Sequence, residues 1–336
     1  MRAFSYQRIE DTDAALRAMR SSGGPQAVNP PVQYLAGGTL LLDLLKLQVL
    51  SPDTVIDINA LRREYGRIVV TEAGLHLGAL VHMAQVADDP RVQAEYPVIA
   101  QSLALAASAQ IRNMATLGGN LLQRTRCPYF RDTSWEACNK RHPGSGCAAR
   151  TAPNRLHAVL GVSDRCISSY PGDFAQALTA LGASVETLHR DGRRSLELER
   201  FYRDSNEPEY ETQLLPGELI TGLWIPAGSW TRRSTYLKIR DRASYEFALA
   251  SAAVALDLSE GSVREVRIAL GGVAYRPWRA REAEAILKGH PLTEANAAAA
   301  ARAAFAGARS AGQNAFKIEL GQRTLVRALL EVGQLA

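Results

Sequence analysis

The sequence predicts an α+β fold built from two or three packed units. The chain has 336 residues, about twice the ~150 of a typical domain. Short runs rich in Val and Ile alternate with longer segments of helical periodicity, so strands and helices are mixed. A stretch from Ala227 to Trp230 follows a strand that ends in proline, and we expect it to link a first unit, residues 1–227, to a second unit, residues 231–336.

The first unit opens with a strand, a helix and a strand between residues 4 and 35. Asp11 or Thr12 is suited to cap the helix, which we expect to run through Met19 and to end at 23–25 (Gly-Gly-Pro). The next segment, 35–41, holds Gly37 and Gly38 and leads into a Leu-rich helix. Glycine amides and a helix N-terminus can together bind a phosphate, although a plain strand-to-helix turn has the same pattern.

A second glycine turn, 116–120, follows further mixed structure. The turn contains Gly118 and Gly119, and without side chains these positions let the backbone approach a ligand closely. Tight packing between elements is the alternative. Around this turn we expect strands at 55–58 and 67–71, a hairpin at 73–78, helices at 79–87, 97–108 and 173–181, a hairpin over 184–198 and a strand at 218–226.

The second unit is also α+β. Strand-like runs come first and Ala-rich helical segments follow, which is typical of helices covering one face of an antiparallel sheet. We expect strands at 234–240, 247–258 and 263–270, and helices at 279–288, 293–308 and 316–333.

Composition excludes several classes of protein. The longest apolar run, 247–256, is much shorter than the ~18 residues that span a bilayer, and we expect no membrane span. The first ten residues lack a continuous apolar stretch, so we expect no export signal. The net charge of +5 is concentrated in residues 112–166, where nine Lys/Arg face three Asp/Glu, a net charge of +6. A basic loop of this kind binds either a nucleic-acid backbone or a buried anion.

All four cysteines of the chain lie inside this basic segment. They are Cys127, Cys138, Cys147 and Cys166. Structural zinc favours Cys-x2-4-Cys pairs, which are absent, and a chain of this length does not need disulfides. Four cysteines in one loop also match the four thiolates of an iron-sulfur cluster. From spacing alone, the cluster, zinc, disulfides and free thiols remain open.

The charge of the loop favours the cluster among these alternatives. An oxidised 4Fe-4S core with four thiolates is a dianion, and burying it requires donors or positive charge nearby. His142 and His157 are candidate replacement ligands that we leave unassigned. The chain shows no Walker A, H-E-x-x-H or nucleophile-elbow pattern, so we assign no catalytic side chain.

Five short motifs together resemble the FAD motifs of xanthine dehydrogenase-type flavin subunits, over essentially the whole chain. They occur at 35–39, 115–120, 172–173, 218–226 and 236–238. The cysteine insertion, residues 124–168, is similar to that of the flavin subunit of bacterial aldehyde oxidoreductases, where it binds a 4Fe-4S cluster. A related insertion occurs in 4-hydroxybenzoyl-CoA reductase.

The resemblance implies a fold and a set of cofactor contacts. The fold is a two-lobed FAD-binding domain of the vanillyl-alcohol oxidase type, with lobes 1–55 and 56–227, followed by a C-terminal α+β domain of the CO dehydrogenase flavoprotein type. Where xanthine oxidases stack an aromatic ring on the flavin, this chain has Ala106, and Tyr245 is a candidate replacement or merely an exposed loop residue. The implied FAD contacts are Ala36, Gly37, Gly38, Thr39, Leu40 and Leu41 at the pyrophosphate; Thr116, Gly118, Gly119 and Asn120 at the flavin and ribityl chain; and Asp173, Lys238 and Ile220 at the ring. The implied cluster ligands are Cys127, Cys138, Cys147 and Cys166.

The resemblance also implies partners. A large subunit with a molybdenum cofactor would oxidise an aldehyde, and a small subunit with two 2Fe-2S clusters would pass electrons to this FAD and on to an external acceptor. Periplasmic export with a partner that carries the signal is implied, with the cytoplasm as the alternative. Other hypotheses are the flavin subunit of a xanthine dehydrogenase or 4-hydroxybenzoyl-CoA reductase type enzyme, a zinc-loop nucleic-acid binder, and an FAD oxidase acting alone.

Overall fold

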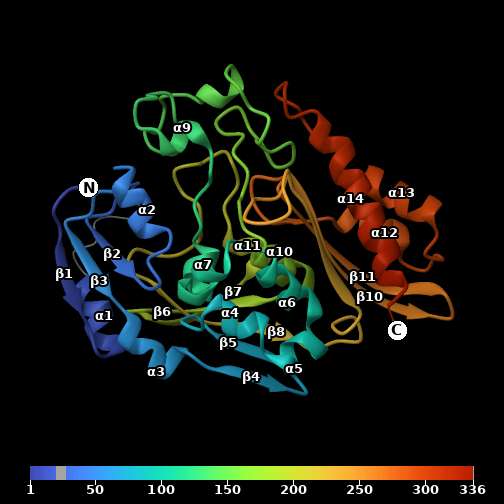
Figure 1. Ribbon diagram of the computed structural model, residues 1–336, viewed down its shortest axis with the longest axis horizontal. Helices are drawn as coiled ribbons and strands as arrows, with labels where there is room; N and C mark the ends of the chain where they lie inside the picture. The colour runs from blue at the N-terminus through green and yellow to red at the C-terminus, as the bar shows by residue number, and fades with distance from the viewer. Residues whose placement is uncertain (20–27, 336) are drawn as a thin grey trace.

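A computed structural model describes residues 1–19 and 28–335 of the chain. The predicted helix end at 23–25 lies outside the described residues. Three sheets and their helices follow one another along the sequence, and they lie from left to right in Figure 1. The α+β prediction is confirmed.

The first sheet is small and parallel. Its order is β1-β3-β2, and Val55 of the central strand pairs with Tyr6 on one side and Gln33 on the other. Asp11 caps α1 by accepting the Ala14 N–H at 2.7 Å, as predicted. The elements are β1 (Ser5–Arg8), α1 (Thr12–Ala18), β2 (Val32–Leu35), α2 (Leu41–Lys46), β3 (Thr54–Asp57) and α3 (Arg62–Tyr65).

The second sheet has five antiparallel strands in the order β4-β5-β8-β6-β7. Leu223 in β8 pairs with Leu77 in β5 and with Val185 in β6, so one buried row crosses the sheet beneath the helices. The strands are β4 (Ile68–Thr71), β5 (Gly74–Gly78), β6 (Ser184–His189), β7 (Gly192–Glu197) and β8 (Leu219–Pro226). The helices are α4 (Met83–Ala87), α5 (Pro90–Glu95), α6 (Pro97–Ala104), α7 (Ala109–Met114), α8 (Leu117–Leu121), α10 (Phe174–Leu181) and α11 (Leu198–Phe201).

Two predicted helices begin or end elsewhere. The helix expected at 79–87 starts at Met83, because the preceding residues follow β5 in extended and turn conformations before His82, the N-cap. The helix expected at 97–108 ends at Ala104, since Ala107 takes a left-handed φ of 50°. A new helix, α7, then begins after Ser108, whose side chain caps it.

The third sheet forms the C-terminal unit in the order β12-β11-β10-β9. One face packs on three helices, which stand at the right of Figure 1, through a core that includes Val254, Ile268, Leu325 and Leu329. Tyr236 and Ala253 belong instead to the core of the first unit. The elements are β9 (Ser234–Ile239), β10 (Ala250–Ser259), β11 (Ser262–Gly271), β12 (Trp278–Arg279), α12 (Arg281–Leu287), α13 (Glu294–Ala304) and α14 (Phe316–Gly333).

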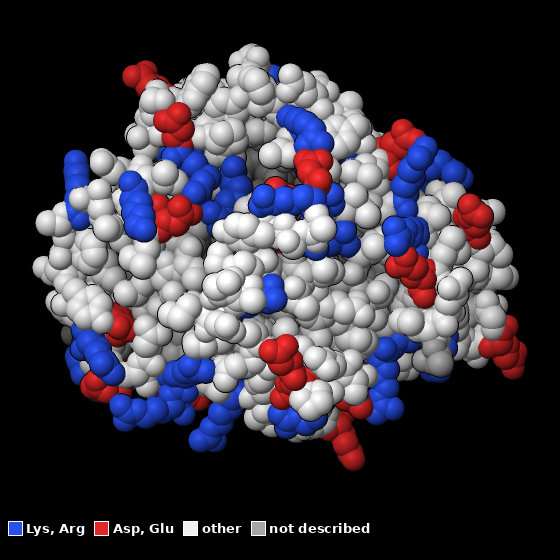
Figure 2. All heavy atoms as spheres, in the orientation of Figure 1, with Lys and Arg blue, Asp and Glu red and all other residues white. Residues whose placement is uncertain are grey.

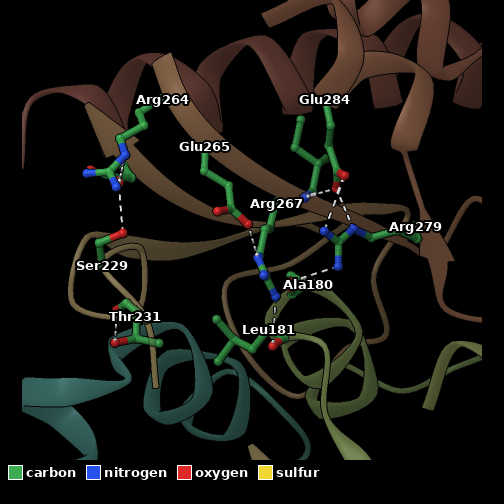
Figure 3. A network of polar contacts seen from close by, with 12 residues as sticks. Ala180, Leu181, Ser229, Thr231, Arg264, Glu265, Arg267, Arg279 and Glu284 are labelled. Carbon is green, nitrogen blue, oxygen red and sulfur yellow. Dashed lines mark hydrogen bonds and ion pairs between the residues drawn. The ribbon is translucent and has the colours of Figure 1, made fainter. Parts of the chain in front are cut away.

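Helix α10 joins the two units. Figure 3 shows Arg267 and Arg279 pointing from the third sheet to its C-terminal end. Arg267 donates to the Leu181 carbonyl at 3.2 Å, and Arg279 donates to the Ala180 carbonyl at 3.0 Å. These cations satisfy carbonyls that the helix leaves free. The opposite, N-terminal end of α10 carries Asp173 as its N-cap residue.

The cysteine loop arches over the space between the units. Its regular structure is limited to the short helix α9 (Pro128–Arg131), at the top of Figure 1, and a 3-10 turn at Ala148–Arg150. The C-terminal segment anchors its descending half, because Asn314 Nδ2 donates to the Ala158 carbonyl at 2.9 Å and Lys317 Nζ donates to the Leu156 carbonyl at 2.9 Å. The loop belongs to the first unit by sequence and also contacts the second.

Candidate cofactor site

A cavity of about 600 Å³ lies where the two glycine turns meet. It reaches from α2 to the N-terminal end of α10, beneath the cysteine loop, and Lys and Arg side chains gather around a recess on this face in Figure 2. Its walls include all of the predicted FAD contacts except Lys238, namely Ala36, Gly37, Gly38, Thr39, Leu40, Leu41, Thr116, Gly118, Gly119, Asn120, Asp173 and Ile220. Segments far apart in sequence thus converge as the resemblance implies.

The two glycine turns touch each other. A Cβ atom on Gly37 would lie 2.0 Å from the Met114 carbonyl oxygen, two residues before Thr116, so only glycine permits this approach. Gly38 takes a φ of 72°, which glycine adopts without strain. The first turn is therefore fixed against the backbone at Met114 and Ala115, which leads directly into the second turn.

The first turn offers unpaired donors to the cavity. Among the described residues, the N–H groups of Gly38, Thr39 and Leu40 find no acceptor. Helix α2 has only six residues. We therefore expect the individual amides, rather than the helix dipole, to contribute most to binding a phosphate. In the second turn, the buried Asn120 Oδ1 also has no partner. The free amides lie on exposed or partly buried residues, so they are open to a polar ligand with phosphate groups such as FAD. An unpaired buried oxygen such as that of Asn120 is rare in native proteins.

A buried ion pair forms the floor of the cavity. Lys238 Nζ lies 2.7 Å from Asp173 Oδ2, and the Tyr236 hydroxyl donates to Asp173 Oδ1 at 2.7 Å. Lys238 is not at the wall itself; its ammonium group lies behind Asp173 and also donates to the Leu105 carbonyl at 3.0 Å. Burial raises the pKa of Asp173, and the neighbouring Lys238 opposes that rise. Tyr236 was not singled out from the sequence, although it lies in the same motif as Lys238.

The cover of the cavity is a loop between β9 and β10. Ala106 lines the cavity, as expected, and leaves room on one side, while Tyr245 and Phe247 reach the wall from this loop. Tyr245 has a left-handed φ of 53° and is 54% exposed. The loop is positioned to cover a ligand while still facing solvent.

The four cysteines line one small cavity in the overlying loop. All four are free thiols, which excludes the disulfide alternative in this structure. Cys138 and Cys147 face each other in an isolated antiparallel bridge. Within the described chain, no group of three or more His, Cys, Asp or Glu side chains is arranged to hold a metal ion. The loop gathers the thiols, and the geometry of a metal centre is not shown.

Hydrogen-bond donors lie close to the cysteine cavity. His157, buried and left unassigned from the sequence, lies with Nε2 3.2 Å from Cys127 Sγ, and its Nδ1 has no partner among the described residues. Burial raises the pKa of the Cys127 thiol to about 12, while the N–H groups of Phe130 and Tyr129 oppose this rise. A free thiolate is disfavoured here, and a thiolate bound to a metal finds ready donors. The surroundings of Cys127 therefore offer N–H groups to an anionic sulfur.

The positive charge of the loop is largely balanced by carboxylates. Carboxylates from outside the loop form ion pairs with most of its Lys and Arg side chains. These acids are distant in sequence and are brought to the loop by the fold. The pairs are Arg124 and Lys140 with Glu211, Arg126 and Arg131 with Asp43, Arg155 with Asp241, and Arg165 with Glu209. Lys140 and Arg165 nevertheless line the cysteine cavity, each beside its carboxylate partner.

Two family models match successive parts of the chain. The profile described as "FAD binding domain in molybdopterin dehydrogenase" matches residues 2–228, and that described as "CO dehydrogenase flavoprotein C-terminal domain" matches residues 235–332. The chain belongs to the FAD-binding subunits of the molybdenum hydroxylase family. No helix in the described part of this FAD-binding subunit is long and apolar enough to cross a membrane.

Relatives of this FAD-binding subunit cover nearly its whole length. It is 45% identical to the aldehyde oxidoreductase FAD-binding subunit PaoB of Escherichia coli, over 98% of each chain, and 28% identical to the glyceraldehyde dehydrogenase medium chain of Sulfolobus acidocaldarius, over 87% of this chain and 83% of that one. Its fold matches a chain of quinoline 2-oxidoreductase from Pseudomonas putida 86, with a TM-score of 0.75, 25% identity and coverage of 99% and 98%. Such relatives are subunits of oxidoreductase complexes.

Proposed function

We propose that the chain is the FAD- and 4Fe-4S-carrying electron-transfer subunit of a molybdenum-containing aldehyde oxidoreductase. The observation that carries the proposal is the convergence of two glycine turns and a buried Lys-Asp pair on one cavity, directly beneath a loop that gathers four free thiols. The 45% identity to an aldehyde oxidoreductase FAD-binding subunit supports the aldehyde as substrate of the complex.

The chain's own residues bind and orient the flavin. The N–H groups of Gly38 to Leu40 would donate to the diphosphate, Asn120 would donate or accept a hydrogen bond, and Ile220 would pack against the ring. Asp173, fixed by Lys238 and Tyr236, would offer the flavin an oriented carboxylate. When bound, FAD would be able to exchange electrons either singly or in pairs. The protein supplies position and electrostatics for that exchange.

The cysteine loop binds the cluster in this proposal. Four thiolates on one cavity match the ligand set of a 4Fe-4S cluster, and each thiolate binds a different iron, so the sulfurs need not surround a single point. A zinc site would bring every sulfur to ~2.3 Å from one ion. The N–H donors near Cys127 offset the charge of the buried cluster.

Spectroscopy of the purified chain tests both cofactors. We expect flavin absorption together with the broad absorption of an iron-sulfur cluster, and analysis should return four irons and four sulfides per chain, as the proposed cluster requires. A colourless, iron-free chain that binds zinc would refute the cluster. Flavin without iron would leave the FAD assignment intact and refute only the cluster.

We further propose that two partners complete the enzyme, a molybdenum-cofactor subunit and a 2Fe-2S subunit, and that the complex is exported to the periplasm through a signal on a partner. The resemblance of the cysteine insertion motivates this proposal. Co-purification from the periplasmic fraction would support it, whereas an assembled complex found only in the cytoplasm would contradict the export. Turnover of aldehydes by the isolated chain would contradict the need for partners.

A further inference from the structure

We propose that the cysteine loop supplies two arginines, Arg126 and Arg131, to the diphosphate part of the FAD site. The inference rests on the proposed FAD function and deepens it, because it assigns a flavin-binding role to the loop that holds the cysteines. It makes the loop a wall of the flavin site as well as the cluster site.

Both guanidinium groups bind the same carboxylate oxygen. Arg126 Nη1 lies 2.9 Å and Arg131 Nη2 lies 2.8 Å from Asp43 Oδ2. Asp43 belongs to α2, the helix that directly follows the first glycine turn. The two arginines are therefore held beside the turn whose N–H groups are free, and all three side chains line the same cavity.

This cluster has an excess of positive charge. Two guanidinium groups share one carboxylate, which leaves a net charge of +1 at the wall. In addition, Arg126 Nε and Arg131 Nη1 are buried and have no hydrogen-bond partner among the described residues. Buried N–H groups of a charged side chain are costly to leave unpaired. A diphosphate in the cavity would offer its acceptor oxygens to the accessible parts of the two guanidinium groups, which line the wall.

The surroundings keep Arg126 in place. Its guanidinium lies over the Phe247 ring, 5.0 Å from the ring centroid, so it is held between α2 and the loop that covers the cavity. The remaining carboxylates of the wall are also paired: Glu246 with Arg242 at 3.5 Å, Glu218 with Arg194 at 3.1 Å and Asp173 with Lys238 at 2.7 Å. Arginine presents several N–H donors in a plane that suits phosphate oxygens. The positions thus combine a fixed cation, free donors and adjacent free amides.

The test compares flavins with and without phosphate. The full chain is freed of flavin, and the dissociation constants of FAD and of riboflavin are measured by fluorescence for wild type, Arg126→Gln, Arg131→Gln and the double variant. The control is Arg150→Gln, which lies in the same loop but pairs with the exposed Asp164 and does not line the cavity. Iron content is measured in every variant.

We expect the double variant to bind FAD about ten- to a hundredfold more weakly, the range for loss of charge-assisted hydrogen bonds, with riboflavin affinity and iron content unchanged. The salt dependence of FAD binding should also become shallower. Unchanged FAD affinity, or equal losses for FAD and riboflavin, would overturn the inference. A wild-type chain that does not bind FAD at all would instead overturn the proposed function from which it starts.

Discussion

Lys238 and Asp173 form a buried ion pair, 2.7 Å apart, that ties the second unit to the N-terminal end of α10. Neither side chain is more than 4% exposed. Replacing Lys238 with Met should therefore lower the free energy of unfolding by about 3–5 kcal/mol, because it leaves a buried carboxylate without its partner. Urea unfolding of the flavin-free chain measures this loss. Adding Asp173→Asn should recover part of it; a single variant as stable as wild type would show that the pair is not important for stability.

Gly37 is expected to tolerate no side chain. In Gly37→Ala the new Cβ would lie 2.0 Å from the Met114 carbonyl oxygen, and the two turns must move apart. We expect a loss of about 1–3 kcal/mol in stability, as for other overpacked sites, together with weaker FAD binding. The matched control is Gly307→Ala, where nothing lies within 4 Å of the added atom. Equal FAD affinity in the two variants would contradict the close contact.

Cys138 is expected to be essential for the cluster. Cys138→Ser should lose the iron and sulfide of the chain, because a thiolate ligand is missing and the cavity is small. Ser134→Ala, in the same loop but bonded only to Asp132, should retain both. Iron and sulfide assays decide the matter, and full iron content in Cys138→Ser would refute the ligation. FAD affinity should also fall, since the loop carries Arg126 and Arg131.

His157 is expected to set the potential of the cluster through its contact with Cys127 Sγ at 3.2 Å. Hydrogen bonds to cluster sulfurs raise the reduction potential, since they stabilise the more negative, reduced form. His157→Phe should retain iron and shift the reduction equilibrium about tenfold, a fall of ~59 mV for a one-electron couple. His157→Gln, which keeps an N–H group, should fall less. Potentiometry that shows three equal potentials would exclude this role.

The buried Lys317 side chain should make the free energy of unfolding increase with pH. Burial, with the nearby Arg155, lowers the pKa of Lys317 to about 7, whereas in an unfolded chain lysine stays protonated to about pH 10.4. Between these values the unfolded state binds more protons, so the free energy of unfolding increases with pH, by at most about 1.4 kcal/mol per unit. Relative to Lys317→Met, wild type should gain about 2 kcal/mol between pH 7 and 8.5.

That comparison needs the variant as its reference. Other titrating groups contribute their own pH dependence, which is common to both proteins. The difference between wild type and Lys317→Met removes this contribution. An equal pH dependence of the two proteins between pH 7 and 8.5 would contradict a neutral, buried Lys317.

The glycine turns illustrate what the sequence can predict. A glycine pair after a strand can be recognised from the sequence alone. The contact of Gly37 with the Met114 carbonyl oxygen explains why this position requires glycine. The break of the helix at Ala107 was not predictable, because nothing in an alanine-rich segment indicates a left-handed residue. The turns could be recognised from their own residues, whereas the ends of the helices depend on tertiary packing.

The partners of the loop arginines were also beyond sequence reasoning. Arg126 and Asp43 are 83 residues apart, and Arg124 and Glu211 are 87 apart. Charge counted along the sequence therefore suggested a cationic shell around the thiols, whereas folding brings distant acids to those cations. His157 lies thirty residues after Cys127, and only the folded loop shows that it reaches the sulfur.

The anchors of the cysteine loop set an order for biogenesis. Asn154, Leu156 and Ala158 are held by groups from residues 311–317, close to the C-terminal end of the chain. On the ribosome these anchors are made after all four cysteines, so the cysteines leave the tunnel before the loop can take its final shape. We therefore expect iron and sulfide to be delivered only after residues 311–317 have emerged.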